Sequence, residues 1–279
     1  TAGRCERAAG RHEYTARRQA VMGEFLPMFR YHMRRNLGTV STWLVSGFVV
    51  LLAGTQGVIT AHMPEIVRAL AGPESAAVLE ASLPAPSWQQ AYAGWLKNLT
   101  QTMSIAVIAV NALTHAAVIR NGDIPFILTR HVRRSHFLLS ALVTSWVSMA
   151  VLGCVGAVIA WGGTAALFPG APFPPIFFAT AAWVLQMVII QTGQLLAAII
   201  KPGVGSPLLT GFAIYVLFLL GSMWERGARY SPLGLSGTVQ GLALDAAGTS
   251  WLLPVATGAI LAGVLAALAN HQFNRAELA

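Results

Sequence analysis

Residues 137–161 read FLLSALVTSWVSMAVLGCVGAVIAW, an apolar stretch of twenty-five residues without a charged side chain. The hydrocarbon core of a bilayer is about 30 Å thick, so a helix needs roughly 20 apolar residues to cross it. Backbone polar groups in lipid must be paired within the spanning structure, which favours a helix over an isolated strand. This stretch therefore predicts a membrane-spanning helix.

Five further windows of similar length also lack charged side chains. They are residues 40–60, 98–118, 176–200, 204–223 and 250–269. Charged residues make up 10% of the chain, against about 25% in soluble domains, which argues against a soluble protein. The sequence therefore predicts an all-α integral membrane protein with six transmembrane helices within residues 40–270.

Lysine and arginine are divided unevenly between alternate gaps. With the N-terminus placed inside, fourteen fall on the inner side: Arg4, Arg7, Arg11, Arg17, Arg18, Arg30, Arg34, Arg35, Arg120, Arg130, Arg133, Arg134, Lys201 and Arg275. Four fall on the outer side: Arg68, Lys97, Arg226 and Arg229. Basic residues accumulate in cytoplasmic loops, so we expect both termini in the cytoplasm of a bacterial inner-membrane protein. The net charge of +8 then reflects topology, and we expect no nucleic-acid partner.

The segments before the first span differ in character. Residues 1–21 are polar and lack an apolar core, so we expect a disordered tail rather than a secretory signal. Residues 22–39 predict an amphipathic helix in the inner headgroup layer, which serves either as an anchor or in a mechanical role. Arg30 and Arg34 would share its polar face. Its apolar face would hold Phe25, Phe29, Met33 and Leu37.

Three segments outside the spans remain. The outer gap at residues 61–97 contains Trp88, Tyr92 and Trp95, which we expect as anchors at the membrane interface. Residues 224–249 are half-apolar and too short to cross twice, so they form either a shallow re-entrant turn or a surface loop. Residues 271–279 predict a cytoplasmic tail.

The connection before the opening stretch gathers positive charge. Residues 120–136 contain four arginines and two histidines. Asp123 can cap a short helix that begins near Ile124, and the basic residues then lie at its far end, where the helix dipole favours positive charge. Such a helix either docks a soluble partner or only satisfies the positive-inside rule.

The stretch GDIPFILTRHVRRSHFLLS, residues 122–140, resembles the signature of the type-2 ABC exporter permeases. In that family a glycine ends the second span, and a segment LL-x-x-P-V-x-R-x-x-F-L-x-x-K leads into the third. His131 stands where proline is usual, and Ser140 or Ala141 where lysine is common. The matching residues are Gly122, Leu128, Val132, Arg134, Phe137 and Leu138. The resemblance extends over nearly the whole chain from residue 22.

This resemblance implies a coupling helix that seats in a separate, soluble ABC ATPase subunit, and a second permease that is the same or a related chain. The coupling residues would be Gly122, Asp123, Phe126, Leu128, Arg130, His131, Arg133 and Arg134. A phosphate-binding loop requires G-x-x-x-x-G-K-[ST], and neither Lys97 nor Lys201 lies in one. We therefore expect no cofactor on this chain and ATP-Mg on the partner, which would drive export of an amphipathic or hydrophobic cargo such as a drug, lipid or peptide.

Polar side chains inside the spans are costly in lipid unless they are paired. They are expected either along a translocation path or in contacts between helices: Asn111, Thr114, His115, Gln186, Gln191 and Gln194. His115 is the only histidine within a predicted span, so an intramembrane enzyme acting on a lipid-like substrate is the alternative. The spans contain no H-E-x-x-H motif and no pair of acids, so we expect neither catalytic residues nor a metal site.

Overall fold

The computed structural model describes residues 25–70, 85–120, 133–244 and 251–276; for Arg120 and Ala243 it describes the backbone alone. Within these ranges the regular structure is helical and contains no strand. The all-α prediction is therefore confirmed for the described part of the chain.

The described helices follow one another along the chain in this order. A helix over residues 25–37 turns at Gly38 into α2 (Val40–Ala61), and a shorter helix over residues 63–70 follows. The next three elements join end to end in one continuous rod: α4 (Trp88–Asn98), the π-helical turn η1 (Leu99–Met103) and α5 (Ser104–Arg120). The remaining elements are α7 (Arg134–Leu167), α8 (Phe173–Ile200), α9 (Gly205–Gly221), α10 (Glu225–Tyr230), the 3-10 turn η2 (Pro232–Gly234), α11 (Leu235–Ala243) and α12 (Leu252–Arg275).

Five helical rods of the described chain are long and apolar enough to cross a bilayer. They are Val40–Ala61, Trp88–Ile119, Arg134–Leu167, Phe173–Ile200 and Leu252–Arg275. Each contains or overlaps a predicted window, so the architecture is that of a multi-pass membrane protein. The window at 204–223 forms α9, which has 17 residues and a length of about 26 Å. Because this length is below the thickness of the hydrocarbon core, the sixth span stays a prediction.

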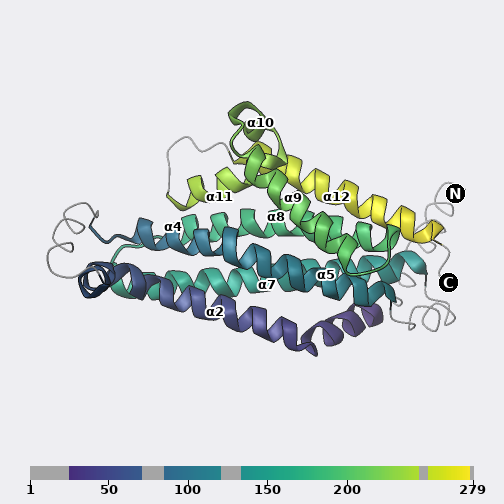
Figure 1. Ribbon diagram of the computed structural model, residues 1–279, viewed down its shortest axis with the longest axis horizontal. Helices are drawn as coiled ribbons and strands as arrows, with labels where there is room; N and C mark the ends of the chain where they lie inside the picture. The colour runs from purple at the N-terminus through teal and green to yellow at the C-terminus, as the bar shows by residue number, and fades with distance from the viewer. Residues whose placement is uncertain (1–24, 71–84, 121–132, 245–250, 277–279) are drawn as a thin grey trace, which may run out of the picture.

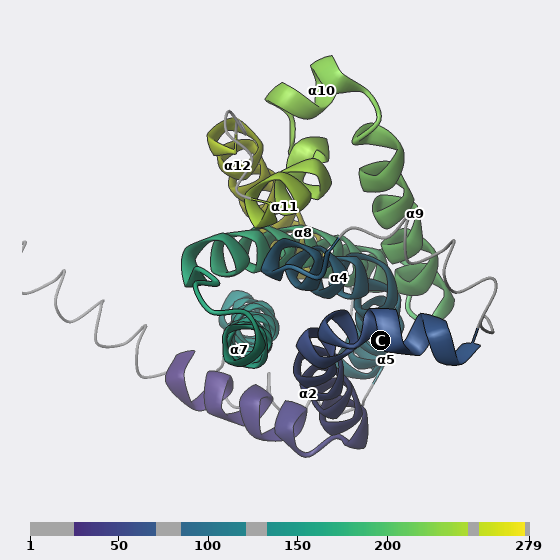
Figure 2. The same cartoon turned by 90° about the vertical axis from the view of Figure 1, so that its left-hand side faces the viewer.

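The rods lie side by side along the long axis of the molecule (Figure 1). The first four alternate in direction, and α12 runs parallel to α8, since both end in the same buried cluster. Helix α8 is the central element, since it packs against α5, α7, α9, α11 and α12. An end-on view places α2 and α7 on one side of α8, and α10, α11 and α12 on the other (Figure 2). Helix α2 packs mainly against α7 and has little contact with α5.

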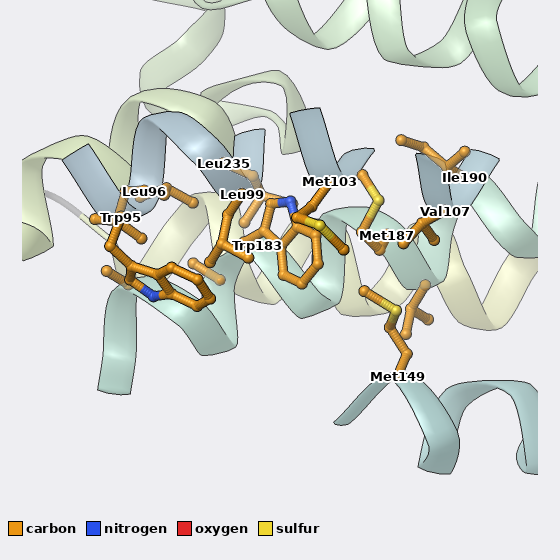
Figure 3. Packing of buried hydrophobic residues seen from close by; sticks show 14 of the residues in the cluster. Trp95, Leu96, Leu99, Met103, Val107, Met149, Trp183, Met187, Ile190 and Leu235 are labelled. Atoms are coloured by element: carbon orange, nitrogen blue, oxygen red, sulfur yellow. The ribbon is translucent and has the colours of Figure 1, made fainter. Parts of the chain in front are cut away.

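The main core lies where α4, η1 and α5 cross α7 and α8 (Figure 3). Trp183 on α8 is fully buried, and its indole N–H donates to the Ser104 hydroxyl at 3.0 Å. The wider turn η1 shifts the helical hydrogen bonds, and two hydroxyls bond its carbonyls. Ser104 donates to Leu99 O at 3.0 Å, and Tyr215 on α9 donates to Thr100 O at 2.7 Å.

The aromatic residues of the gap at 61–97 do not all lie where the sequence predicts. Tyr92 and Trp95 are fully buried on α4, and the Tyr92 hydroxyl donates to Pro172 O at 2.8 Å. Trp88 is half-buried against the Tyr92 ring. The expectation of interface anchors is therefore wrong for Tyr92 and Trp95. Both lie on the second rod, which begins ten residues before the predicted window.

A second buried cluster joins one end of the bundle. Val118 at the end of α5, Phe137 near the start of α7, Ile199 at the end of α8 and Phe273 at the end of α12 pack together. The described basic side chains within a few residues of this cluster, together with those of the helix over 25–37, define the basic end: Arg30, Arg34, Arg35, Arg133, Arg134, Lys201 and Arg275. The four basic residues that the sequence predicts on the outer side lie on segments other than those of the basic end: Arg68, Lys97, Arg226 and Arg229. The orientation of the basic end toward the cytoplasm stays a prediction.

The helix over residues 25–37 forms within the predicted range, but a different side of it faces the bundle. His32 is 4% exposed, and its ring lies edge-on to that of Phe137, with 4.9 Å between the centroids. Leu37 is 49% exposed, and the other members of the predicted apolar face are half-buried. His32 therefore faces protein, while the predicted apolar face remains partly uncovered.

Residues 224–243 fold into two short helices and a 3-10 turn against the bundle. Leu235 and Val239 of α11 belong to the main core, and the Ser236 hydroxyl donates to Gln186 Oε1 at 3.3 Å. The chain passes so close to itself at Gly234 that a Cβ atom there would lie 1.9 Å from Ala228 O. This part of the segment is thus packed on the bundle. Its depth in the membrane stays a prediction, and residues 245–249 lie outside the described ranges.

Candidate functional site: a polar cavity at the basic end

A cavity of about 180 Å³ lies between the helix over 25–37, α2, α5, α7 and α8. We call it the polar cavity, after its polar lining residues: His32, Arg35, Asn36, Thr39, Thr42, Ser46, Asn111, Thr114, His115, Thr144, Ser145, Ser148 and Gln191. Polar side chains in membrane helices usually face the bundle interior or a cavity. The polar groups of four apolar rods, α2, α5, α7 and α8, therefore converge here.

The roof of the polar cavity is the turn between the helix over 25–37 and α2. Asn36 fixes this turn because its Nδ2 donates to the Ser148 hydroxyl on α7 at 2.9 Å, and its Oδ1 accepts from the Thr42 hydroxyl at 3.0 Å. Arg35 reaches the other wall, where Nη2 donates to Ala117 O on α5 at 3.3 Å. The roof is thus bonded to both α5 and α7.

Four of the six intramembrane polar residues predicted from the sequence line this cavity: Asn111, Thr114, His115 and Gln191. The Thr114 hydroxyl donates to Val110 O at 3.0 Å, and Gln191 Oε1 accepts from the Ser145 hydroxyl. His115 is 4% exposed and Gln191 is 1% exposed. In the described structure, neither His115 Nε2 nor Gln191 Nε2 has a hydrogen-bond partner. Buried polar atoms of this kind are rare in folded proteins and mark a place where a ligand can bind.

The other two glutamines join helices instead of lining the polar cavity. Gln194 Nε2 donates to Ile108 O at 2.9 Å and ties α8 to α5. Gln186 accepts from Ser236 and ties α8 to α11. Gln186 and Gln194 therefore make interhelical contacts, and Gln191 both contacts Ser145 on α7 and lines the cavity. A role in a translocation path stays a prediction.

The predicted coupling residues are only partly described. Gly122, Asp123, Phe126, Leu128, Arg130 and His131 lie outside the described residues. Arg133 precedes α7 and is exposed at the basic end. Arg134 bonds within the chain, since its Nη1 donates to Ala276 O at the end of α12 at 2.9 Å. Arg134 thus has a structural contact that the sequence did not indicate.

Sequence reasoning missed the roof and the α7 wall of the cavity. On α7 the lining positions recur at intervals of three and four, which places them on one helical face: Ala141, Thr144, Ser145, Ser148, Met149 and Leu152. This stripe of hydroxyls is a signal that the sequence offers. On the roof, His32 and Asn36 lie one helical turn apart. Patterns of apolar and charged residues do not indicate them, because neither is apolar or permanently charged.

The charge of the described lining comes from one arginine. Burial, assisted by the positive charge of Arg35, lowers the pKa of His32 to about 4, so this imidazole is neutral at neutral pH. The described lining residues include no aspartate, glutamate or cysteine. The described residues also form no cluster of three or more His, Cys, Asp or Glu side chains that could hold a metal ion. The arrangement offers hydrogen-bond donors and one positive charge, which suits binding of an anion.

The described chain is therefore all-helical, with the architecture of a multi-pass membrane protein and a polar cavity next to its basic end. The cavity extends from Arg35 on the roof to Gln191 on the central helix α8. Neither a protein-family model nor a curated protein matches this chain.

Proposed function

We propose that this chain is the permease subunit of an ATP-driven ABC exporter in the cytoplasmic membrane, and that it moves an amphipathic or hydrophobic cargo. The observation that carries the proposal is the polar cavity, because a cargo with a polar group needs polar contacts among otherwise apolar helices. The resemblance of residues 122–140 to the type-2 exporter permeases supports the same function. The basic end would face the cytoplasm, as the positive-inside rule favours.

The position of the cavity suggests how an ATPase drives transport. Residues 120–136 connect α5 to α7, and both of these helices line the polar cavity. A displacement of this connection reaches the cavity through two rigid rods. ATP binding would close a pair of ATPase subunits on the basic end and push this connection. Helices α5 and α7 would then move relative to α2, and the cavity would change its access.

The subunit composition follows from the same argument. ATP hydrolysis would take place on separate ABC ATPase subunits, and a second permease of the same or a related sequence would complete the route. The alternative is an intramembrane enzyme centred on His115. The lining residues that the structure describes give His115 no carboxylate partner for acid–base chemistry, so transport accounts for more of the site.

Reversing the charge of the connection is expected to remove the ATPase. We predict that the full chain, purified with an affinity tag from its native membranes in mild detergent, retains an ABC ATPase subunit. The double variant Arg130→Glu, Arg133→Glu is expected to retain at least about tenfold less of the ATPase subunit than the wild type. Like charges across an interface weaken association strongly. Arg134 stays unchanged, because its contact with Ala276 supports the fold.

The matched control is Arg30→Glu, Arg34→Glu. It makes the same change of charge on two exposed residues of the basic end, outside the connection. The control is expected to retain the ATPase. Purified wild-type chain without any ATPase would contradict the proposal, and so would equal retention by the double variant and the control.

A further inference from the structure

We infer that the polar cavity holds the anionic head of a phospholipid drawn from the membrane leaflet at the basic end. The inference concerns binding, and it goes beyond the proposed function because a lipid can bind here whether or not the chain is a permease. It rests on the hydrogen-bonding groups of the cavity, on its charge and on the apolar surfaces beside it.

Donors from different helices converge on the cavity. Gln191 on α8 has its Oε1 engaged by Ser145, which leaves an amide NH₂ that has no partner in the described structure. The His115 ring on α5 adds a buried Nε2, which donates in one of its two tautomers. The roof adds the Arg35 guanidinium. An oxygen-rich anion accepts hydrogen bonds from all three groups, and charge-assisted bonds are the strongest of their kind.

The charge of the surroundings selects an anion. Arg35 is the charged residue among the described lining, which includes no carboxylate. The other arginines of the basic end make the local electrostatic potential more positive. Basic pockets between membrane helices near a bilayer surface are typical binding sites for anionic lipid headgroups.

The apolar residues beside the cavity indicate a lipid rather than a free anion. Val45, Val107, Val110 and Leu152 contribute an apolar part of the lining. Many lining side chains of α2 and α5 are only half-buried, and these two helices make little contact with each other. The described helices thus leave the cavity partly uncovered between α2 and α5. On α2, Trp43, Leu44 and Phe48 are exposed apolar side chains in the same turns as the lining residues Thr42, Val45 and Ser46. Acyl chains can leave the cavity on this side and lie against apolar surface.

The test measures lipid binding by the full chain in detergent micelles after delipidation. Native mass spectrometry would count bound phosphatidylglycerol and phosphatidylcholine with identical acyl chains. Thermal shift would compare the stabilisation by phosphatidylglycerol with that by inorganic phosphate alone. We expect wild-type protein to bind phosphatidylglycerol about tenfold more tightly than phosphatidylcholine, and phosphate alone to have no effect on the melting temperature.

Two variants from separate elements test the assignment. Arg35→Gln and Gln191→Leu are each expected to weaken phosphatidylglycerol binding about tenfold, because each removes donors from the head site. The control is Arg34→Gln, which removes the same charge from the neighbouring exposed position. It should weaken binding far less than Arg35→Gln, because Arg34 adds only to the general potential of the basic end. If one cavity variant does not fold, the other still decides, because the two side chains come from different helices.

Three outcomes would overturn the inference. Equal affinity of the wild type for the two lipids would exclude selection of an anionic head. A loss in Arg34→Gln as large as in Arg35→Gln would indicate general attraction to the basic end instead of a site. Stabilisation by inorganic phosphate equal to that by phosphatidylglycerol would assign the cavity to a soluble anion.

Discussion

Replacing Trp183 by alanine is expected to lower the free energy of unfolding by roughly 3 kcal/mol, within the range for large-to-small core substitutions. Trp183 on α8 is fully buried at the centre of the bundle. Its ring packs against the rod formed by α4, η1 and α5 and against neighbouring side chains of α8 (Figure 3). Its loss removes dispersion contacts with Leu99, Met103 and Met187, and it also removes the hydrogen bond to Ser104. In a bilayer this packing, rather than transfer from water, carries the stabilisation.

Two further variants separate packing from hydrogen bonding. Trp183→Phe keeps most of the ring and is expected to cost only about 1 kcal/mol, as interhelical hydrogen bonds in membranes do. Trp43→Ala makes the same truncation at a side chain that is 65% exposed. It should cost no more than about 1 kcal/mol, because it removes only the indole hydrogen bond to Leu37 O at 2.8 Å and no core packing. Unfolding in mixed micelles with increasing dodecyl sulfate, followed by circular dichroism, measures all three. A loss in Trp43→Ala equal to that in Trp183→Ala would show that Trp183 is not a core residue.

The substitution Gly57→Leu is expected to separate α2 from α7 and to lower the free energy of unfolding by about 2–3 kcal/mol, in the range of overpacked cores. A Cβ atom at Gly57 would lie 2.9 Å from Gly163 O and 3.0 Å from Gly163 C, both of which are backbone atoms of α7. Backbone cannot move aside as a flexible side chain can. Because α2 forms a wall of the polar cavity, the same variant should also bind phosphatidylglycerol less tightly.

Gly47→Leu is the matched control, since it places the same side chain on the same helix. A Cβ atom at Gly47 would meet no heavy atom within 4 Å, so this variant should fold as stably as the wild type. The same unfolding titration compares the two variants. Equal stability of Gly47→Leu and Gly57→Leu would contradict the close approach of α2 and α7.

The lengths of the rods show what hydrophobic patterning predicts and what it misses. Runs of uncharged residues located all five long rods because lipid tolerates few charges. The ends were less predictable. The second rod begins at Trp88 instead of residue 98, since Tyr92 and Trp95 pack into the protein core. The third covers 34 residues, about 51 Å, and extends beyond the uncharged window at both ends. Burial against neighbouring helices, which composition does not encode, accounts for the early start of the second rod.

The polar cavity illustrates a second limit. The sequence identified Asn111, His115 and Gln191 as polar groups in lipid, because such residues are costly and rare. It did not separate Gln191 from Gln186, although they lie about 140° apart around one helix and meet different neighbours. Nor did it indicate Arg35 as a lining residue, since the partner of each helical face depends on how the rods are rotated against each other.

Chemical crosslinking at Arg133 tests the central claim, that this end of the bundle contacts an ATPase, most directly. The full chain, with Cys5 and Cys154 replaced by serine, would carry either Arg133→Cys or, as the control, Arg226→Cys on α10, which is also exposed. A thiol-reactive crosslinker would be applied in native membranes, and the products identified by mass spectrometry. We predict that Arg133→Cys becomes linked to a soluble ABC ATPase subunit and that Arg226→Cys does not. Crosslinking of an ATPase through position 226, or through neither position although both thiols are labelled, would contradict the account.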